Sequence, residues 1–418
     1  MLHGAVNHFS SLRGALHCEQ VPLARIAKEV GTPTYVYSTA TLVRHLTVLQ
    51  DAFKGIPHLH CYAMKANPSL AILKLFAQRG AGFDIVSGGE LVRVLAARGR
   101  ASKVVFSGVG KTEEEMAFAL REGILQFNVE SAEELYALDK VARRLKLVAP
   151  FALRVNPHVD ARTHRYIATG LKSSKFGVPF EEAVALYRAS RKLKGLNARG
   201  LDCHIGSQVT DAQPVRLAIG RVADLFRSLR SEGFGLTHLD VGGGLGITYT
   251  DEKPPSVTEY ARAVLTPLKG IDATLVMEPG RVLVGNAGVL LTRVLYRKKT
   301  PARHFVIVDA GMNDLLRPAL YEAHHDIVPV QPRRGKKLKS DVVGPICESS
   351  DVLGYGRLLP PQEQGDLLAV LTAGAYGMSM ASNYNGRPRP AEVLVDGKSF
   401  RVVRRRESLE DLLRNETT

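Results

Sequence analysis

The sequence has few cysteines, and their spacing argues against two common kinds of scaffold. Four cysteines occur in 418 residues, at positions 18, 61, 203 and 347, and no two of them form a C-x-x-C pair. This spacing indicates neither a zinc site nor a disulfide framework. Cysteines without such a framework fit a reducing compartment, so we expect a cytoplasmic location.

Long apolar runs are also absent. No stretch approaches the ~18 consecutive apolar residues that cross a bilayer, so we expect no membrane partner. Residues Met1–Cys18 contain no acid and lack the apolar core of a secretory signal. We interpret them as packed or frayed chain, with organelle targeting as the second interpretation.

Positive charge is in excess. The formal net charge is +15 at pH 7, while 45% hydrophobic and 23% charged residues are ordinary for a soluble globular protein. A nucleic-acid binder could have this charge, but the basic residues are scattered, with dense spots only at 333–339 and 404–406. We interpret both spots as solvated chain and expect no nucleic-acid partner. The positive field could instead attract an anionic cofactor or substrate.

Apolar runs alternate with amphipathic stretches through the middle of the chain. The predicted strands are His58–Met64, Gly82–Val86, Lys103–Phe106, Leu125–Val129, Phe151–Val155, Gly200–His204, Leu239–Val241 and Thr274–Met277. The predicted helices between them include Leu70–Arg79 capped by Ser69, two that begin with capping boxes at Thr112 and Ser131, and Pro179–Leu193, Pro214–Ser231 and Ser256–Leu268. Eight strand–helix units predict a closed (β/α)₈ barrel over residues 38–281, with a doubly wound open sheet as the alternative.

The chain after residue 281 has a different pattern of predicted secondary structure. Strands are predicted there at Val282–Tyr296, His304–Asp309, Asp341–Ile346, Leu367–Leu371 and Ala391–Val403, with Gly, Pro and Asn turns and few helices. This pattern predicts an all-β domain over residues 282–418. Residues 1–37 are expected to join that domain, because Tyr35–Tyr37 has the pattern of an extra strand.

Lys65 stands at the end of the first predicted barrel strand, in Tyr-Ala-Met-Lys-Ala-Asn. Active sites of such barrels lie at the C-terminal ends of the strands. Partial desolvation disfavours an ammonium ion, and a neutral amine attacks aldehydes to form a Schiff base. The alternative is a rim lysine that keeps its charge in water.

Two further motifs follow predicted barrel strands. The glycines of Gly242-Gly243-Gly244 would let backbone N–H groups approach a phosphate, and the spacing fits neither a Walker loop nor a dinucleotide fingerprint. Glu278 precedes Pro279-Gly280-Arg281, and an acid beside a pyridine nitrogen keeps that nitrogen protonated, so that the ring accepts electrons well. Ordinary structural turns are the alternative for both motifs.

Two histidine sites complete the candidates. His204 ends a predicted strand and could stack on a flat cofactor ring, or it could be a buried structural residue. His324-His325-Asp326 has poor ligand spacing, and we expect no metal.

Together these motifs resemble the fold-type III pyridoxal-phosphate-dependent decarboxylases, from about residue 33 to residue 384. The family has a (β/α)₈ barrel and a β domain, which agrees with the strand pattern. The blocks His204–Gln208, Arg317–Tyr321 and Cys347–Asp351 are similar to the subfamily that acts on diaminopimelate. The resemblance implies decarboxylation of meso-2,6-diaminopimelate to L-lysine and CO2, the last step of lysine biosynthesis.

The resemblance also implies roles for single residues. Pyridoxal 5'-phosphate would be bound by Lys65, His204, Ser207, Gly243, Gly244, Glu278, Gly280, Arg281 and Tyr376. The substrate would be bound by Arg281, Arg317, Tyr321, Glu348 and Tyr376. The catalytic residues would be Lys65 as the Schiff-base lysine, His204, Glu278, and Cys347 as the proton donor. Family members build each site from two subunits, so we expect a homodimer in which the partner supplies Cys347 and Glu348.

Three alternatives remain. The first is an ornithine- or arginine-type decarboxylase of polyamine synthesis. Decarboxylases of ornithine lack the Arg317–Tyr321 pair, which suits a substrate whose far end carries a carboxylate, while Glu348 suits a distal amine. Alanine racemases share the barrel but place an arginine at the ring nitrogen, where this chain has Glu278. A cofactor-binding homologue without activity is disfavoured by the joint presence of Lys65, Cys347 and Glu278.

Overall fold

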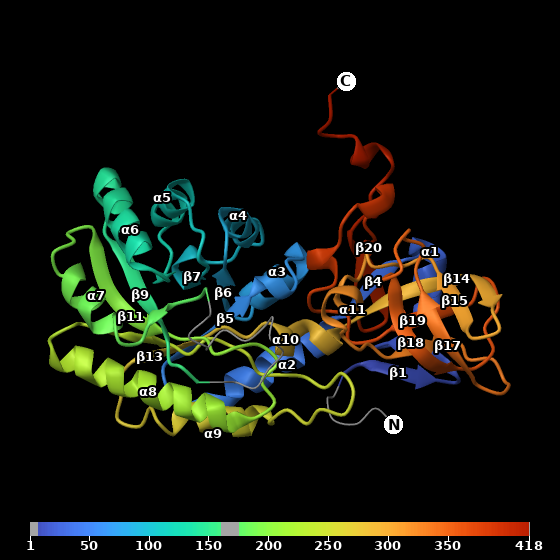
Figure 1. Ribbon diagram of the computed structural model, residues 1–418, viewed down its shortest axis with the longest axis horizontal. Helices are drawn as coiled ribbons and strands as arrows, with labels where there is room; N and C mark the ends of the chain where they lie inside the picture. Colours follow the sequence, from blue (N-terminus) through green and yellow to red (C-terminus); the bar gives the residue numbers. More distant parts are fainter. Residues whose placement is uncertain (1–6, 160–174, 418) are drawn as a thin grey trace. The chain divides into compact units, whose positions relative to one another are not determined.

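The computed structural model describes residues 7–159 and 175–417, which divide into two compact units (Figure 1). The barrel unit comprises residues 46–247 and 253–282, and the β unit comprises residues 1–45, 248–252 and 283–418. Helix α2 (Thr39–Ala52) carries the chain from the β unit into the barrel unit.

Within the described residues, eight parallel strands form a closed barrel. They are β5 (His58–Ala63), β6 (Gly82–Ile85), β7 (Val104–Phe106), β8 (Gln126–Val129), β9 (Ala149–Asn156), β11 (Leu196–Asp202), β12 (His238–Asp240) and β13 (Thr274–Met277). β13 pairs with β5, and β8 pairs with β9, so each of these eight strands has a neighbour on both sides. The predicted barrel is confirmed, and the open-sheet alternative is wrong because the β8–β9 ladder closes the sheet.

Helices alternate with these strands and surround the barrel in Figure 1. They are α3 (Leu70–Ala77), α4 (Gly88–Ala96), α5 (Glu113–Glu122), α6 (Ala132–Leu145), α7 (Ala183–Ser190), α8 (Ala212–Ser231) and α9 (Val257–Leu265). Thr112 and Glu115 form the predicted capping box of α5. At α6 the N–H of Glu134 donates to the Ser131 side chain, while the Glu134 carboxylate binds the Glu130 N–H and Lys111. That box is therefore only half formed.

Two local predictions in the barrel unit were wrong. Ser69 precedes α3 but gives no side-chain cap, and its own N–H donates instead to Oδ1 of Asn67. The helix predicted from Pro179 begins only at Ala183, because Val178–Pro179 forms the short strand β10 beside β9. In the first case the Asn67 side chain accepts from the Ser69 N–H, and in the second the pairing of β10 with β9 outweighs the helical pattern.

The β unit contains a large mixed sheet. Its strands are β4 (Thr34–Ser38), β14 (Gly288–Lys299), β15 (His304–Val308), β16 (Ile327–Pro329), β17 (Leu338–Val343), β18 (Val352–Leu359), β19 (Leu367–Val370), β20 (Ala391–Asp396) and β21 (Ser399–Arg404). β4 lies between β14 and β20, so the N-terminal strand joins the C-terminal sheet as predicted. The strand predicted from Val282 begins only at Gly288, because α10 (Arg281–Val284) precedes it.

Smaller elements complete the β unit. They are β1 (Phe9–Leu12), β2 (Ala15–Cys18), β3 (Val21–Pro22), α1 (Leu23–Val30) and α11 (Arg317–Tyr321). Val289, Val36 and Val393 are buried side by side in the core of this unit, on the three paired strands β14, β4 and β20. Their burial favours folding by roughly 25 cal/mol for each Å² of apolar surface removed from water.

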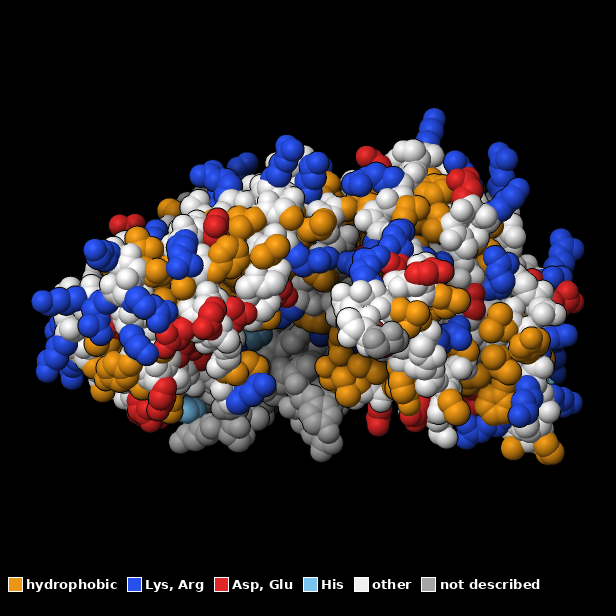
Figure 2. Space-filling view, turned by 90° about the horizontal axis from the view of Figure 1, so that it is seen from above, with side chains coloured by type: hydrophobic (Ala, Val, Ile, Leu, Met, Phe, Trp, Pro, Cys, Tyr) orange, Lys and Arg blue, Asp and Glu red, His pale blue; other side chains and the backbone are white. Residues whose placement is uncertain are grey.

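The surface carries its positive charge in dispersed form on the face seen in Figure 2. Lys and Arg side chains are spread among hydrophobic and acidic ones there. In the described part of the chain, no helix combines the length and the apolar character that a bilayer crossing requires.

Candidate active site

Lys65 lies directly after β5, in the single turn Met64–Ala66. Its Nζ is 2.9 Å from Oδ2 of Asp84, which lies on the neighbouring strand β6. The Lys65 side chain is 42% exposed, whereas that of Asp84 is fully buried. The amine is therefore at the C-terminal end of a barrel strand, open to solvent and paired with a buried carboxylate.

The glycine loop after β12 is packed between two other strand ends. A Cβ on Gly243 would lie 2.1 Å from the carbonyl oxygen of Glu278. A Cβ on Gly244, where φ is +102°, would lie 2.2 Å from the carbonyl oxygen of Gly206. Only glycine permits these approaches, and the resulting backbone contacts connect the ends of β11, β12 and β13.

His204 follows β11 and lies beside this loop. The Gly243 N–H donates to its Nδ1 at 3.1 Å, so the proton of the neutral ring is on Nε2. Burial, and then the positive charges of Arg154 and Lys65, lower the pKa of His204 well below its usual value. The ring is therefore neutral at physiological pH.

The Glu-Pro-Gly-Arg turn after β13 is joined to the strand that carries Lys65. The Ala63 N–H donates to the carbonyl of Pro279 at 3.0 Å. Gly280 packs on the same strand, because a Cβ there would lie 3.2 Å from Cβ of Ala63. Nη2 of Arg281 donates to Oγ of Ser207 at 3.1 Å. Arg281 and Ser207 are thereby held together on the same end of the barrel.

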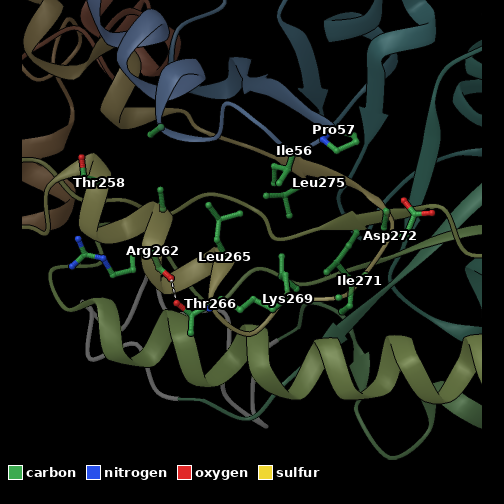
Figure 3. Close-up of a pocket in the computed structure, with 16 residues that line it drawn as sticks. Ile56, Pro57, Thr258, Arg262, Leu265, Thr266, Lys269, Ile271, Asp272 and Leu275 are labelled. Atoms are coloured by element: carbon green, nitrogen blue, oxygen red, sulfur yellow. Dashed lines mark hydrogen bonds between the residues drawn. The ribbon is translucent and has the colours of Figure 1, made fainter.

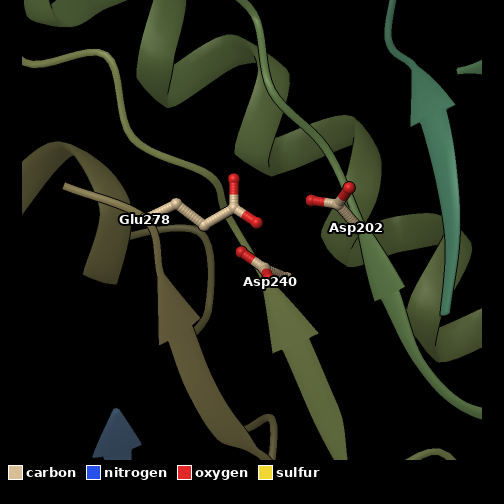
Figure 4. A group of neighbouring side chains, drawn as sticks. All are labelled: Asp202, Asp240 and Glu278. Carbon is tan, nitrogen blue, oxygen red and sulfur yellow. The ribbon is translucent and has the colours of Figure 1, made fainter. Parts of the chain in front are cut away.

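Glu278 belongs to a buried group of acids (Figure 4). Oxygens of Asp202, Asp240 and Glu278 lie within 4.8 Å of one another, at the ends of β11, β12 and β13. Nδ2 of Asn128 donates to Oε1 of Glu278 at 3.2 Å and to Oδ2 of Asp240 at 3.3 Å, and Oγ of Ser107 donates to Oε1 of Glu278 at 3.2 Å.

The electrostatics of this acidic group favour an added positive charge. Burial, reinforced by the charges of Asp240 and Asp84, raises the pKa of Glu278 well above its usual value, although Lys65 and Arg154 act in the opposite direction. Carboxylates in this setting prefer to hold a proton or to face a cationic group.

Inward-facing polar residues of the barrel were not singled out from the sequence. Asp202, Asp240, Asn128 and Ser107 are all buried. Burying a polar side chain is costly unless it is partnered, so polar residues inside otherwise apolar strands were the available signal. The sequence pattern could not show which of them meet.

The other predicted site residues belong to the β unit. Arg317 and Tyr321 are the first and last residues of α11. Tyr376 follows β19 and has a positive φ of 57°. Cys347 and Glu348 lie between β17 and β18, and both are exposed.

Two residues near Cys347 were missed by sequence reasoning. The Cys347 N–H donates to Oδ1 of Asn385 at 2.9 Å, and the Tyr384 hydroxyl donates to the Glu348 carboxylate. This pair therefore holds the turn that presents Cys347 and Glu348. The only available signal was the Asn-Tyr-Asn triplet at 383–385, which gives no indication of its partners.

A pocket of about 750 Å³ lies at the opposite end of the barrel strands (Figure 3). Its walls include Ile56 and Pro57 before β5, Leu265 of α9 and Leu275 of β13. It contains none of the predicted site residues. Because catalytic groups of such barrels come from the C-terminal strand ends, we place the candidate site there and not in this pocket.

Comparisons with known proteins identify the family of this chain. Residues 39–285 match the family described as pyridoxal-dependent decarboxylase, pyridoxal binding domain. The curated diaminopimelate decarboxylase of Vibrio cholerae is 55% identical over 400 residues, covering 96% of each chain. That of Pseudomonas aeruginosa is 54% identical over 409 residues, covering 98% of each chain. Diaminopimelate decarboxylase from Helicobacter pylori, crystallised with L-lysine, aligns with a TM-score of 0.91 at 44% identity, covering 94% of this chain and 98% of that one.

Proposed function

We propose, from the premise that this chain belongs to the family of pyridoxal-dependent decarboxylases, that it converts meso-2,6-diaminopimelate to L-lysine and carbon dioxide. Such a reaction is the last step of lysine biosynthesis. The observation that carries the proposal is the pairing of β5 with β13, which joins the strand before Lys65 to the strand before Glu278. An amine and a buried acid on adjacent strand ends suit a cofactor that needs one group at its aldehyde and the other at its ring nitrogen.

The barrel site fits pyridoxal 5'-phosphate, the cofactor of the family. The acidic group favours a cationic partner, and the glycine loop packs against neighbouring carbonyls more closely than any side chain would allow. Lys65 would bond to the aldehyde carbon, Glu278 would hold the proton of the ring nitrogen, and the neutral His204 would lie against the ring. When bound, the cofactor supplies a ring that accepts the electron pair released as the carboxylate leaves.

The phosphate would be held by Ser207, Gly243, Gly244 and the Gly280-Arg281 turn. Gly243 and Gly244 differ in one respect. The Gly243 N–H already donates to His204, whereas Gly244 makes no N–H hydrogen bond within the described residues. We therefore expect Gly244 to be a stronger phosphate contact than Gly243. Gly243 would also need to release His204.

The β unit would supply the groups that hold the substrate and return a proton. Arg317, Tyr321 and Arg281 would bind the carboxylate at the far end of the substrate, and Glu348 would bind the ammonium there. Tyr376 would contact cofactor and substrate. Sγ of Cys347 would give its proton to the carbon that has lost CO2, so that one proton replaces the departing group.

We also propose a homodimer with shared sites and a cytoplasmic location. The exposure of Cys347 and Glu348 supports the first proposal, because both are ordered by Asn385 and Tyr384 and yet remain on the surface. Most soluble homo-oligomers are two-fold symmetric, and such symmetry would complete two sites at once.

The function is tested by product identification. Purified protein with added pyridoxal 5'-phosphate should release L-lysine and CO2 from meso-diaminopimelate, and it should release little putrescine from ornithine. Borohydride treatment should leave a reduced cofactor adduct on Lys65, detectable by peptide mass spectrometry. Lys65→Ala should lose both the adduct and turnover. Putrescine as the main product, or turnover without an adduct on Lys65, would contradict the proposal.

Sharing of sites is tested by mixing variants. Lys65→Ala and Cys347→Ala should each be nearly inactive, whereas a 1:1 mixture refolded together should regain about a quarter of wild-type activity, because half of the dimers would be mixed and each would have one intact site. A mixture as inactive as its components would indicate that each chain builds its own site.

A further inference from the structure

Arg317 is buried beside a histidine that can only be neutral in its observed contacts. One Nη of Arg317 is 2.9 Å from Nε2 of His325, and Nδ1 of His325 is 2.9 Å from the carbonyl oxygen of Leu371. A carbonyl oxygen only accepts, so Nδ1 carries the proton. Arginine only donates, so Nε2 must offer its lone pair. The two contacts together fix a single tautomer.

The surroundings of His325 keep that tautomer uncharged. Its side chain is fully buried. Burial, and then the positive charge of Arg317, lower the pKa of His325 to about 3. The ring therefore accepts from Arg317 throughout the physiological range and does not repel it.

Tyr249 adds a second contact to the guanidinium. The guanidinium carbon of Arg317 lies 4.6 Å from the centre of the Tyr249 ring, and that ring meets the His325 ring edge to face at 5.5 Å. A cation over an aromatic face is attracted to it, and a planar guanidinium is oriented by such stacking. Neither the aromatic face nor the imidazole lone pair neutralises the charge of Arg317.

We infer that His325 and Tyr249 are positioning residues that orient Arg317 toward the distal carboxylate of the substrate. The inference rests on the proposed function, in which Arg317 binds that carboxylate. His325 and Tyr249 orient the guanidinium without contributing a negative charge that would compete with an anionic ligand. A carboxylate in the place of His325 would bind the same nitrogen but would compete with the substrate for the charge. This assigns a use to the His324-His325-Asp326 segment that is unrelated to metal binding.

The test compares two ligands that differ in this carboxylate. L-Lysine retains the distal carboxylate and the distal amine, whereas cadaverine, its decarboxylated analogue, lacks the carboxylate. Both should be titrated calorimetrically into the cofactor-loaded protein, and KM and kcat for meso-diaminopimelate should be measured alongside. In His325→Phe, L-lysine should bind about 10-fold more weakly, while cadaverine should change less than about twofold, because only the carboxylate contact is disturbed.

Conservative replacements separate positioning from general damage. His325→Gln keeps an acceptor for Arg317 and should return L-lysine affinity to within about threefold of wild type. Tyr249→Leu should weaken L-lysine binding about fivefold through loss of the aromatic face, whereas Tyr249→Phe, which keeps that face, should weaken it less than Tyr249→Leu does. In each weakened variant KM should rise more than kcat falls.

The ratio of the L-lysine and cadaverine affinities does not depend on turnover. The positioning role and the proposed function can therefore fail separately. Equal weakening of both ligands in His325→Phe, or no change in either, would overturn the positioning role. The same holds if the wild-type protein does not prefer L-lysine over cadaverine. A wild-type protein that prefers L-lysine but releases none from meso-diaminopimelate would contradict the proposed function alone.

Discussion

Replacing Asp202 by Asn should stabilise the cofactor-free protein, although it alters a residue of the barrel interior. Asp202 is 1% exposed, and its Oδ1 has no hydrogen-bond partner in the described part of the chain. One oxygen from each of Asp202, Asp240 and Glu278 lies within 4.8 Å of the others, and two unit charges at that distance repel by about 3.5 kcal/mol at an effective dielectric constant of about 20. Asn keeps the shape and removes this repulsion.

Proton uptake limits the gain. Instead of bearing the full repulsion, Asp202 can hold a proton, which costs about 1.4 kcal/mol for each pH unit above its ordinary pKa of about 3.9. The largest possible gain in the free energy of unfolding is therefore about 5 kcal/mol at pH 7.5 and about 1.5 kcal/mol at pH 5. The attraction of Arg154 opposes the gain. We expect Asp202→Asn to raise the free energy of unfolding by about 1–3 kcal/mol at pH 7.5 and by less than about 1 kcal/mol at pH 5.

The stability difference grows with pH because the pKa of Asp202 is raised in the folded state. Burial, then the charge of Glu278, raise the pKa of Asp202 well above its usual value. The folded state therefore holds the proton more tightly than the unfolded state. The contribution of Asp202 to wild-type stability is greatest below its ordinary pKa, and it is lost as the pH rises toward its pKa in the folded state. Asn does not titrate, so the difference between variant and wild type must widen from pH 5 to pH 7.5.

Urea unfolding at the two pH values measures this difference. The chain has no tryptophan, so far-ultraviolet circular dichroism is the appropriate signal. Asp224→Asn is the matched control, because Asp224 is 80% exposed beside Arg227 on α8 and should change stability at neither pH. A variant no more stable than wild type at pH 7.5, or equally stabilised at both pH values, would refute the buried charge of Asp202 as the cause.

Two further substitutions test the scaffold and the Cys347–Glu348 turn. Lys111 donates to the carbonyls of Gly108 and Asn128, both at 2.8 Å, and to Glu134 at 2.7 Å, with its side chain fully buried. Lys111→Met should lower the free energy of unfolding by about 3–5 kcal/mol, because it leaves the Glu134 carboxylate buried without its cation; urea unfolding beside the exposed-site control Lys140→Met measures the loss. Tyr384→Phe should raise KM for meso-diaminopimelate by about 3- to 10-fold with a smaller change in kcat, because Glu348 loses the hydroxyl that orients it. The control is Tyr355→Phe, which removes the hydroxyl of a surface tyrosine that is 63% exposed. Equal steady-state KM and kcat values for the two variants would exclude this role of Tyr384.

The strand pattern and the motifs could be recognised from the chain alone because both are local. Each barrel strand is a short apolar run bounded by polar turns, and all eight predicted runs became strands with ends shifted by a few residues. Lys65 and Glu278 were recognisable for the same reason, since each ends such a run within a short motif. The number of runs, and not the strength of any one, distinguished a closed barrel from an open sheet.

Contacts between distant segments were decided only by the tertiary structure. Asp202 and Asp240 meet because they end neighbouring parallel strands, and Tyr384 reaches Glu348 across 36 residues of chain. His325 owes its tautomer to Leu371, 46 residues away, and owes its use to Arg317. Hydrogen bonds and buried charges depend on separations of a few ångströms, and a one-dimensional pattern carries no information on such distances until the chain has folded.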